Sequence, residues 1–170
     1  EKEVGTIEQI NVTPIRKYQF IVGKLTPLWI LAMFELTFGL IIAKIFYFVP
    51  IEGNILVLFG FAAIYLIGCL GLGLLISTIS DTQQQAVFIT WFIMVIFILL
   101  GGLFTSIDNM PQWVQYITYI NPVRYFIEVI RLVMLKGAAF ADIQRQFIIV
   151  SSISFILLTL AVLRYRKTSN

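Results

Sequence analysis

The sequence contains no histidine and only one cysteine, Cys69. Without histidine, these residues cannot form a His-based catalytic triad, a zinc site with a histidine ligand or an imidazole proton shuttle. A single cysteine cannot form an intrachain disulfide, and it gives no information on the redox compartment. We therefore predict that this chain has no catalytic residue set and no metal site.

Charged residues are also scarce. They make up 12% of the 170 residues, while hydrophobic residues make up 59% and the mean hydropathy is +0.94. An average soluble domain has about 25% charged residues, so this chain has too few polar side chains to cover a compact soluble fold. The composition excludes an ordinary cytosolic enzyme, a disordered tail and a nucleic-acid-binding domain, and it predicts a membrane protein.

Long runs without charge predict an all-α membrane protein, a polytopic helical bundle with four spanning helices. A helix needs about 20 mostly apolar residues to cross the bilayer. Three long runs carry no charged residue, and a fourth, residues 27–48, contains only Glu35 and Lys44. The predicted spans lie near residues 26–48, 55–79, 84–105 and 146–164. The first three fill residues 25–105, and the last, with a basic tail, fills residues 146–170.

The basic residues predict the orientation of the bundle. Four spans place both ends of the chain on one side of the membrane. That side carries seven of the 12 Lys and Arg residues, and the opposite side carries five. Because short cytoplasmic loops are enriched in Lys and Arg, we predict that both ends are cytoplasmic.

Residues 1–24 precede the spans and alternate apolar and polar positions. Ile7 and Ile10 share one face if this part is helical. Thr13 and Pro14 suit the N-cap and first position of a second short helix, which we expect to end near Gly23. Such a segment either rests on lipid headgroups or docks on another protein, and the residues themselves leave both open.

Residues 106–145, a long connection between spans, are predicted to be structured. An aromatic segment starts at Pro111, Asn121 and Pro122 interrupt it, and a helix over residues 123–135 ends at Gly137. Aromatic residues such as Trp113 suit the membrane–water interface. One charged stripe follows the second helix, and it either pairs along the helix or forms a solvated face: Arg124, Glu128 and Arg131.

Two ionisable residues lie within the first span. Charge inside the bilayer is costly and marks a pathway or a pair. Lys44 can extend its ammonium toward the interface, whereas Glu35 lies deeper and suits either a hydrogen bond to a neighbouring helix or a role in substrate passage. In the second span, the spacing of Gly73 and Ser77 predicts a close helix contact.

Three motifs carry a resemblance to a known family. They are EKEVGTIEQINVTP at the start, GLGLLISTISDTQQQA at residues 71–86 and MPQWVQYITYINPVRYFIEVIRLVMLKG at residues 110–137. In this order they resemble permease subunits of type-2 ABC exporters, and most closely the bacterial multidrug-export-like subfamily. The resemblance covers essentially the whole chain. It implies the C-terminal part of a permease, with a first span, an external domain and a second span expected before Glu1.

The resemblance also implies roles for individual segments. Residues 1–13 would form a coupling helix that docks on a separate ATPase subunit, and residues 81–86 would form the second cytoplasmic turn. The implied ATPase-contacting residues are Glu3, Gly5, Thr6, Glu8, Gln9 and Asp81. The hairpin at residues 110–137 resembles re-entrant helices and would contribute to an external gate, with Trp113, Asn121, Pro122, Arg124, Glu128 and Arg131 as its key residues.

The implied function is that of a membrane permease in an ATP-driven exporter of the bacterial inner membrane. The chain lacks the GxxxxGK[ST] phosphate-binding loop, so it is not expected to be an enzyme or to bind a cofactor. ATP and Mg²⁺ would bind the partner ATPase. A second permease, identical or different, would complete the transporter, and nucleic acid is not an expected partner. Two alternatives stay open: a proton-coupled secondary transporter that uses Glu35, and a membrane scaffold without transport.

Overall fold

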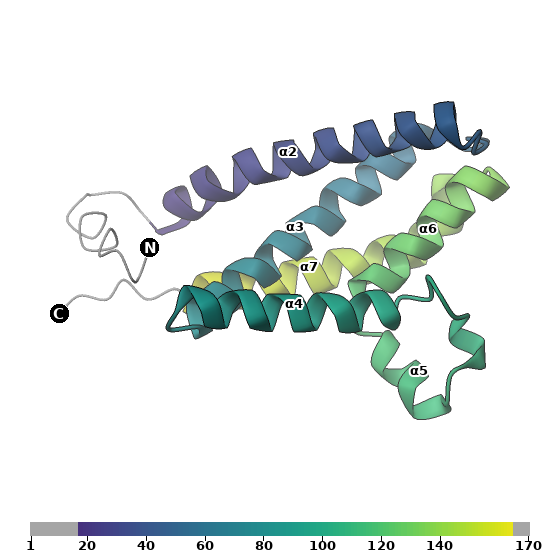
Figure 1. Cartoon of the computed structure of the whole chain (residues 1–170). Helices are drawn as coiled ribbons and strands as arrows, with labels where there is room; N and C mark the ends of the chain where they lie inside the picture. Colours follow the sequence, from purple (N-terminus) through teal and green to yellow (C-terminus); the bar gives the residue numbers. More distant parts are fainter. Residues whose placement is uncertain (1–16, 165–170) are drawn as a thin grey trace.

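The computed structural model describes residues 17–164, which form helices joined by turns, with no strand among them. Four long helices alternate in direction (Figure 1). They are α2 (Lys17–Phe46), α3 (Ile55–Ile79), α4 (Gln83–Leu99) and α7 (Gln144–Arg164). Between α4 and α7 lie η1 (Ile107–Asn109), α5 (Gln112–Thr118), α6 (Pro122–Lys136) and η2 (Phe140–Ile143).

Three helical stretches are long and apolar enough to cross a membrane: Tyr18–Phe46, Ile55–Ile79 and Phe140–Arg164. The prediction of an all-α membrane protein is thus confirmed at the level of fold class. α4 is also apolar, but it has 17 residues and is shorter than the predicted span of residues 84–105. It stops because Leu100 caps its end and two glycines follow, the second with a φ of 80° that ordinary residues avoid.

The helices define two ends of the bundle (Figure 1). The beginning of α2, the α3–α4 turn and the end of α7 share one end, which we call the terminal end. The α2–α3 turn, α5 and α6 lie at the other, which we call the hairpin end. This arrangement agrees with the predicted alternation of the helices.

α3 is the central helix, and it packs against α7 along most of its length. Two glycines of α3 permit this close approach. A Cβ atom at Gly68 would collide with the Ser154 side chain, and one at Gly71 would stand 3.1 Å from the Leu158 nitrogen. The Ser154 hydroxyl donates a hydrogen bond of 3.0 Å to the Ile64 carbonyl and so fixes the register of the two helices.

The predicted close contact at Gly73 is wrong for residues 17–164, because a Cβ atom there would meet nothing within 4 Å among them. The sequence correctly predicted that small residues of α3 contact a neighbouring helix, but it assigned the contact to the wrong face of α3. Gly68 and Gly71, one turn apart, face α7 instead.

A cluster of apolar side chains fills the space between α3, α6 and α7. The rings of Tyr65 and Phe126 stack with their centroids 4.3 Å apart, and Phe61 and Phe126 are parallel neighbours at 6.4 Å. Because α6 supplies half of the buried members of this cluster, it is part of the core of the hairpin end. Those buried members are Leu58, Phe61, Tyr125, Val129, Val133, Met134, Ile143 and Val150.

α2 differs from its prediction at its beginning. The helix runs without interruption through Gly23 and Pro27, so the expected helix end near Gly23 is wrong. Proline removes one backbone hydrogen bond, but neighbouring Ser and Thr side chains compensate in apolar helices. The carbonyl that loses its helical donor at Pro27 is that of Gly23, and the Thr26 hydroxyl beside it donates to the preceding carbonyl, Val22, at 2.7 Å.

α2 and α4 expose large apolar side chains. No residue of the most apolar stretch of α2 is buried, and no residue of α4 is buried. Phe34 and Phe38 on α2, and Phe88 and Trp91 on α4, are among many that are more than half exposed. Apolar surfaces of this extent face lipid or further protein.

Candidate functional site

The hairpin formed by α5 and α6 (residues 112–136) is the most elaborate polar region that the structure describes. α6 begins and ends as the sequence predicted: Asn121 is its N-cap, Pro122 occupies the first turn, and Gly137 ends it with a φ of 64°. Tyr125, Val129 and Val133 recur on one face and pack into the core. The hairpin is therefore a packed element of the bundle.

Asn121 fastens the hairpin to the end of α4. Its Oδ1 accepts a hydrogen bond of 3.0 Å from the Val123 backbone, which is the capping interaction. Its Nδ2 donates a bond of 2.7 Å to the Phe97 carbonyl in the last turn of α4. The side chain is only 2% exposed, so both bonds are shielded from water.

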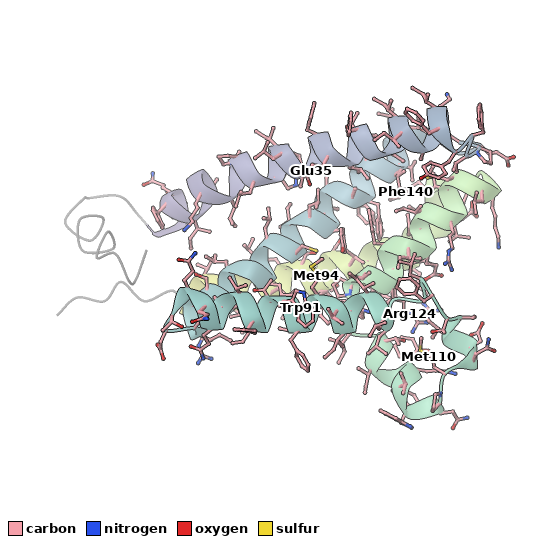
Figure 2. All side chains as sticks on the ribbon, viewed as in Figure 1. Glu35, Trp91, Met94, Met110, Arg124 and Phe140 are labelled. Carbon is pink, nitrogen blue, oxygen red and sulfur yellow. The ribbon has the colours of Figure 1, made fainter. Side chains whose placement is uncertain are left out.

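Arg124 lies where α5 meets α6 (Figure 2). It donates a hydrogen bond of 2.5 Å to the Thr118 hydroxyl, and its guanidinium carbon lies 4.5 Å from the centre of the Tyr119 ring. The Tyr125 hydroxyl donates to the Tyr119 carbonyl at 2.9 Å. Burial raises the pKa of Tyr125, against the opposing effect of Arg124, and keeps this phenol a neutral donor. Together these contacts fold α5 back onto α6.

Glu128 and Arg131 continue the polar side of α6. Glu128 Oε1 accepts a bond of 2.9 Å from the Gln146 amide in α7, and Arg131 donates one of 3.1 Å to the Gly102 carbonyl beyond α4. Between residues 17 and 164 no ion pair joins the three members of the predicted stripe, so pairing along the helix is wrong. They connect α6 to three different segments instead.

α5 carries the exposed aromatic side chains of the hairpin. Trp113 and Tyr116 are 68% and 71% exposed. The amide of Gln115 donates to the Met110 carbonyl at 2.8 Å and holds α5 against the preceding turn. The exposed rings suit a membrane–water interface.

Asp81 lies in the turn between α3 and α4 at the terminal end (Figure 1). Thr82 caps α4 by accepting a bond from the Gln85 backbone at 3.1 Å, and the Gln85 side chain accepts one of 3.1 Å from the Asp81 N–H. This reciprocal pair fixes the turn, and the exposed Asp81 carboxylate stands next to a helix N-terminus. The other implied ATPase-contacting residues, Glu3, Gly5, Thr6, Glu8 and Gln9, lie outside the described residues.

Glu35 lies near the middle of α2 (Figure 2). It is exposed, and within residues 17–164 it has no hydrogen-bond partner on a neighbouring helix. Its role in substrate passage stays a prediction. Lys44 is in the last turn of α2 and borders a groove that is described below.

Sequence reasoning missed the partners of the hairpin. Gln146 was not singled out, although its amide binds Glu128 and its own carbonyl is buried without a partner in the described part of the chain. A polar residue at the start of an apolar run is a weak signal that could have identified it. The Phe97 and Gly102 carbonyls carry no sequence signal, because any residue supplies a carbonyl.

Comparison with known proteins identifies the family. The sequence profile of the family described as ABC-2 family transporter protein matches residues 1–164. The chain belongs to this ABC-2 transporter family. The resemblance inferred from three motifs is thereby confirmed. Family membership and three helices of spanning length make this chain a multi-pass segment of an ABC transporter permease of the bacterial inner membrane.

Several ABC-2 relatives come from Escherichia coli (strain K12). The probable multidrug ABC transporter permease YbhR is 37% identical over 82% of this chain and 38% of its own length. The corresponding permease YbhS is 33% identical over 94% of this chain and 43% of its own. The inner membrane transport permease YhhJ is 28% identical over 99% and 45%. This chain thus spans less than half the length of these relatives, and no solved structure matches it significantly.

Proposed function

We propose that this chain forms the substrate pathway and the coupling region of an ATP-driven exporter whose ATPase is a separate subunit. One observation carries the proposal. Residues 1–16 join α2 at the terminal end, where the Asp81 turn also lies, and the polar hairpin occupies the opposite end (Figure 1). The helix that follows the implied coupling segment therefore begins at the same end of the bundle as the Asp81 turn.

We propose that α4 is the fourth span and that the terminal end is cytoplasmic. α4 begins beside the ends of α3 and α7 and runs alongside the bundle to the start of the hairpin (Figure 1). Its 17 residues span about 26 Å at 1.5 Å per residue. The short turns after Leu99 complete the crossing.

The uninterrupted α2 suits transmission of movement. Its 30 residues give a rigid element of about 45 Å, longer than the hydrocarbon core of about 30 Å. Movement of an ATPase against residues 1–16 reaches the hairpin end through this single helix. A second permease copy, identical or different, faces the exposed sides of α2 and α4 and completes the pathway.

We propose that the hairpin is part of the exit gate. Asn121 and Arg131 join it to the end of α4, Glu128 joins it to α7, and Arg124 joins its two helices. Replacing Asn121 and Pro122 by alanine removes the cap and favours one continuous helix, and we expect export to fall more than ATPase docking. A cross-link between the hairpin and Phe104 should block release. Rapid amide exchange throughout residues 110–137 in the assembled transporter would contradict the gate.

Transport by the assembled complex tests the main proposal. The full-length permease, co-expressed with a candidate ATPase, is purified and reconstituted in vesicles with ethidium, since relatives are named multidrug permeases. We expect the ATPase to co-purify and ATP to drive dye movement. Dye movement driven by a proton gradient without ATPase, and abolished by Glu35→Gln, would favour the secondary transporter. An ATPase complex without dye- or lipid-stimulated hydrolysis would favour the scaffold.

The coupling region is tested by charge reversal. Glu8→Arg and Asp81→Arg should each lower ATP-driven export while the permease still inserts in the membrane. Asp108→Arg is the matched control, because Asp108 is also exposed but lies at the hairpin end. Unchanged export in Glu8→Arg and Asp81→Arg, with a normally assembled complex, would exclude the docking role.

A further inference from the structure

A groove lies between the last turns of α2 and the first turns of α3, at the hairpin end. Its volume is about 210 Å³. Four residues of one α2 face form one wall, and the α2–α3 turn and α3 form the other. The groove is lined by Thr37, Leu40, Ile41, Lys44, Ile51, Ile55 and Phe59.

The two polar residues of the groove lie at different depths along α2. Lys44 stands two residues from the end of the helix, and Thr37 lies two turns deeper. The Thr37 hydroxyl donates to the Met33 carbonyl at 2.8 Å, so it is already satisfied within its own helix. The groove is therefore an apolar slot with one cation at its mouth.

The Lys44 ammonium lacks a counter-ion in the part of the chain that the structure describes. Glu52 is the acidic residue of the adjacent turn. Its backbone N–H donates to the Met134 carbonyl, and a Cβ atom added at Gly137 would lie 3.6 Å from the Glu52 Cβ, so this turn lies against the end of α6. A cation near the end of a spanning helix lies at headgroup depth, because about 3 Å separates it from the helix end at 1.5 Å per residue. Anionic phosphates are the groups available at that depth.

We propose that this groove binds an anionic phospholipid of the leaflet at the hairpin end. Its phosphate pairs with Lys44, and one acyl chain lies along Leu40, Ile41 and Phe59 toward Thr37. The partial negative charge at the end of α2 attracts the Lys44 ammonium and keeps it at the groove mouth. A lipid bound between α2 and α3 sets the distance between these two helices at the hairpin end. The inference is independent of the ATPase and of the transported substrate.

Photolabelling tests the site. Full-length permease is placed in phosphatidylcholine vesicles that contain a trace of phosphatidylglycerol with a diazirine on its acyl chain, and the labelled peptides are identified by mass spectrometry. We expect label within residues 37–59. Lys44→Gln should lower it about fivefold, the effect of one basic residue near an anionic surface, whereas Lys44→Arg should retain it.

Lys136→Gln is the matched control, since Lys136 is also an exposed lysine in the last turn of a helix at the hairpin end. It should leave labelling unchanged. Equal labelling by a phosphatidylcholine probe, unaffected by Lys44→Gln, would overturn the proposal, because the groove would then take any acyl chain. Absence of label from residues 37–59 would also overturn it, because other protein would then cover the groove. Retained labelling in Lys44→Arg shows that loss in Lys44→Gln is not misfolding.

Discussion

At the scale of single residues, the Asn121 side chain both caps its own helix and binds a second helix. Asn54 caps α3 in the same way, accepting a bond from the backbone N–H two residues ahead at 2.8 Å. Only Asn121 also donates to another helix, through the bond to the Phe97 carbonyl. Comparing variants of Asn54 and Asn121 therefore separates the stability that a cap contributes from the stability that a hydrogen bond between helices contributes.

Asn121→Ala should therefore cost more stability than Asn54→Ala. A lost cap costs about 1 kcal/mol, and a buried carbonyl left without its donor adds about 1–3 kcal/mol. Thermal unfolding of the full-length protein in detergent measures both variants. Asn121→Asp keeps the cap acceptor but sets a carboxylate oxygen against the Phe97 carbonyl, so it should also melt below Asn54→Ala. Equal melting temperatures for Asn121→Ala and Asn54→Ala would show that the bond to α4 contributes nothing.

Arg124 should not tolerate lysine. The planar guanidinium both stacks over Tyr119 and donates to the Thr118 hydroxyl, and an ammonium cannot reproduce this pair of contacts. A double-mutant cycle of Arg124→Lys and Tyr119→Leu should give a coupling energy of about 0.5–1 kcal/mol in unfolding free energy. If the changes in unfolding free energy of the two substitutions add exactly, the stacking interaction contributes nothing to stability.

The sequence located the break at Asn121 and Pro122 and the end of α6 at Gly137, because capping chemistry is local. It could not give the role of the Asn121 amide. The acceptor, the Phe97 carbonyl, is 24 residues away and has no side-chain identity to recognise. The same reason hides the partners of Arg131 and Glu128, which only tertiary packing selects.

At the scale of helices, the contact between α3 and α7 depends on two missing side chains. Gly68→Val should push α7 away from α3, since its Cβ would collide with Ser154. Gly73→Val is the matched control, because its Cβ would meet nothing within 4 Å. We expect overpacking at Gly68 to cost about 1–3 kcal/mol, measured by thermal unfolding, and Gly73→Val to be near neutral. Comparable losses in both variants would place the helix contact elsewhere.

Boundaries of helices were predicted best where charge or capping residues mark them. α3 begins and ends at the predicted residues, 55 and 79. The start of α2 was missed, because Gly23 and Pro27 interrupt helices in water. In an apolar environment the backbone must satisfy its own hydrogen bonds, so helices continue through such residues.

At the scale of the whole molecule, topology is open to direct measurement. In a Cys69→Ala background, Gln112→Cys lies at the hairpin end and Gln84→Cys at the terminal end, and both positions are exposed. An impermeant maleimide should label position 112 in intact cells and position 84 only after lysis. The reverse pattern would invert the orientation predicted from the basic residues.

The arrangement of the long helices could be predicted from the sequence better than the contacts between their side chains. Hydropathy located three helices of spanning length and the shorter apolar α4, because lipid as a solvent imposes length and composition on each helix. It did not reveal that α6 belongs to the core. α6 carries charge at Arg124, Glu128 and Arg131, and its apolar face is short, so only the packed structure shows that Val129 and Val133 are fully buried.

α4 stops after 17 residues while its neighbours are 21 to 30 residues long, and under our proposal that α4 is a span, this difference would make the bundle sensitive to bilayer thickness. As a span, α4 is about 26 Å long beside a hydrocarbon core of about 30 Å. The turns after Leu99 then complete the crossing only where lipid next to α4 thins or α4 stands upright while longer neighbours tilt, and each ångström of mismatch costs a fraction of a kcal/mol. Lipids with longer acyl chains would raise this strain first on α4, the shortest of the four long helices. Membrane thickness therefore acts on the helix to which Asn121 and Arg131 tie the hairpin.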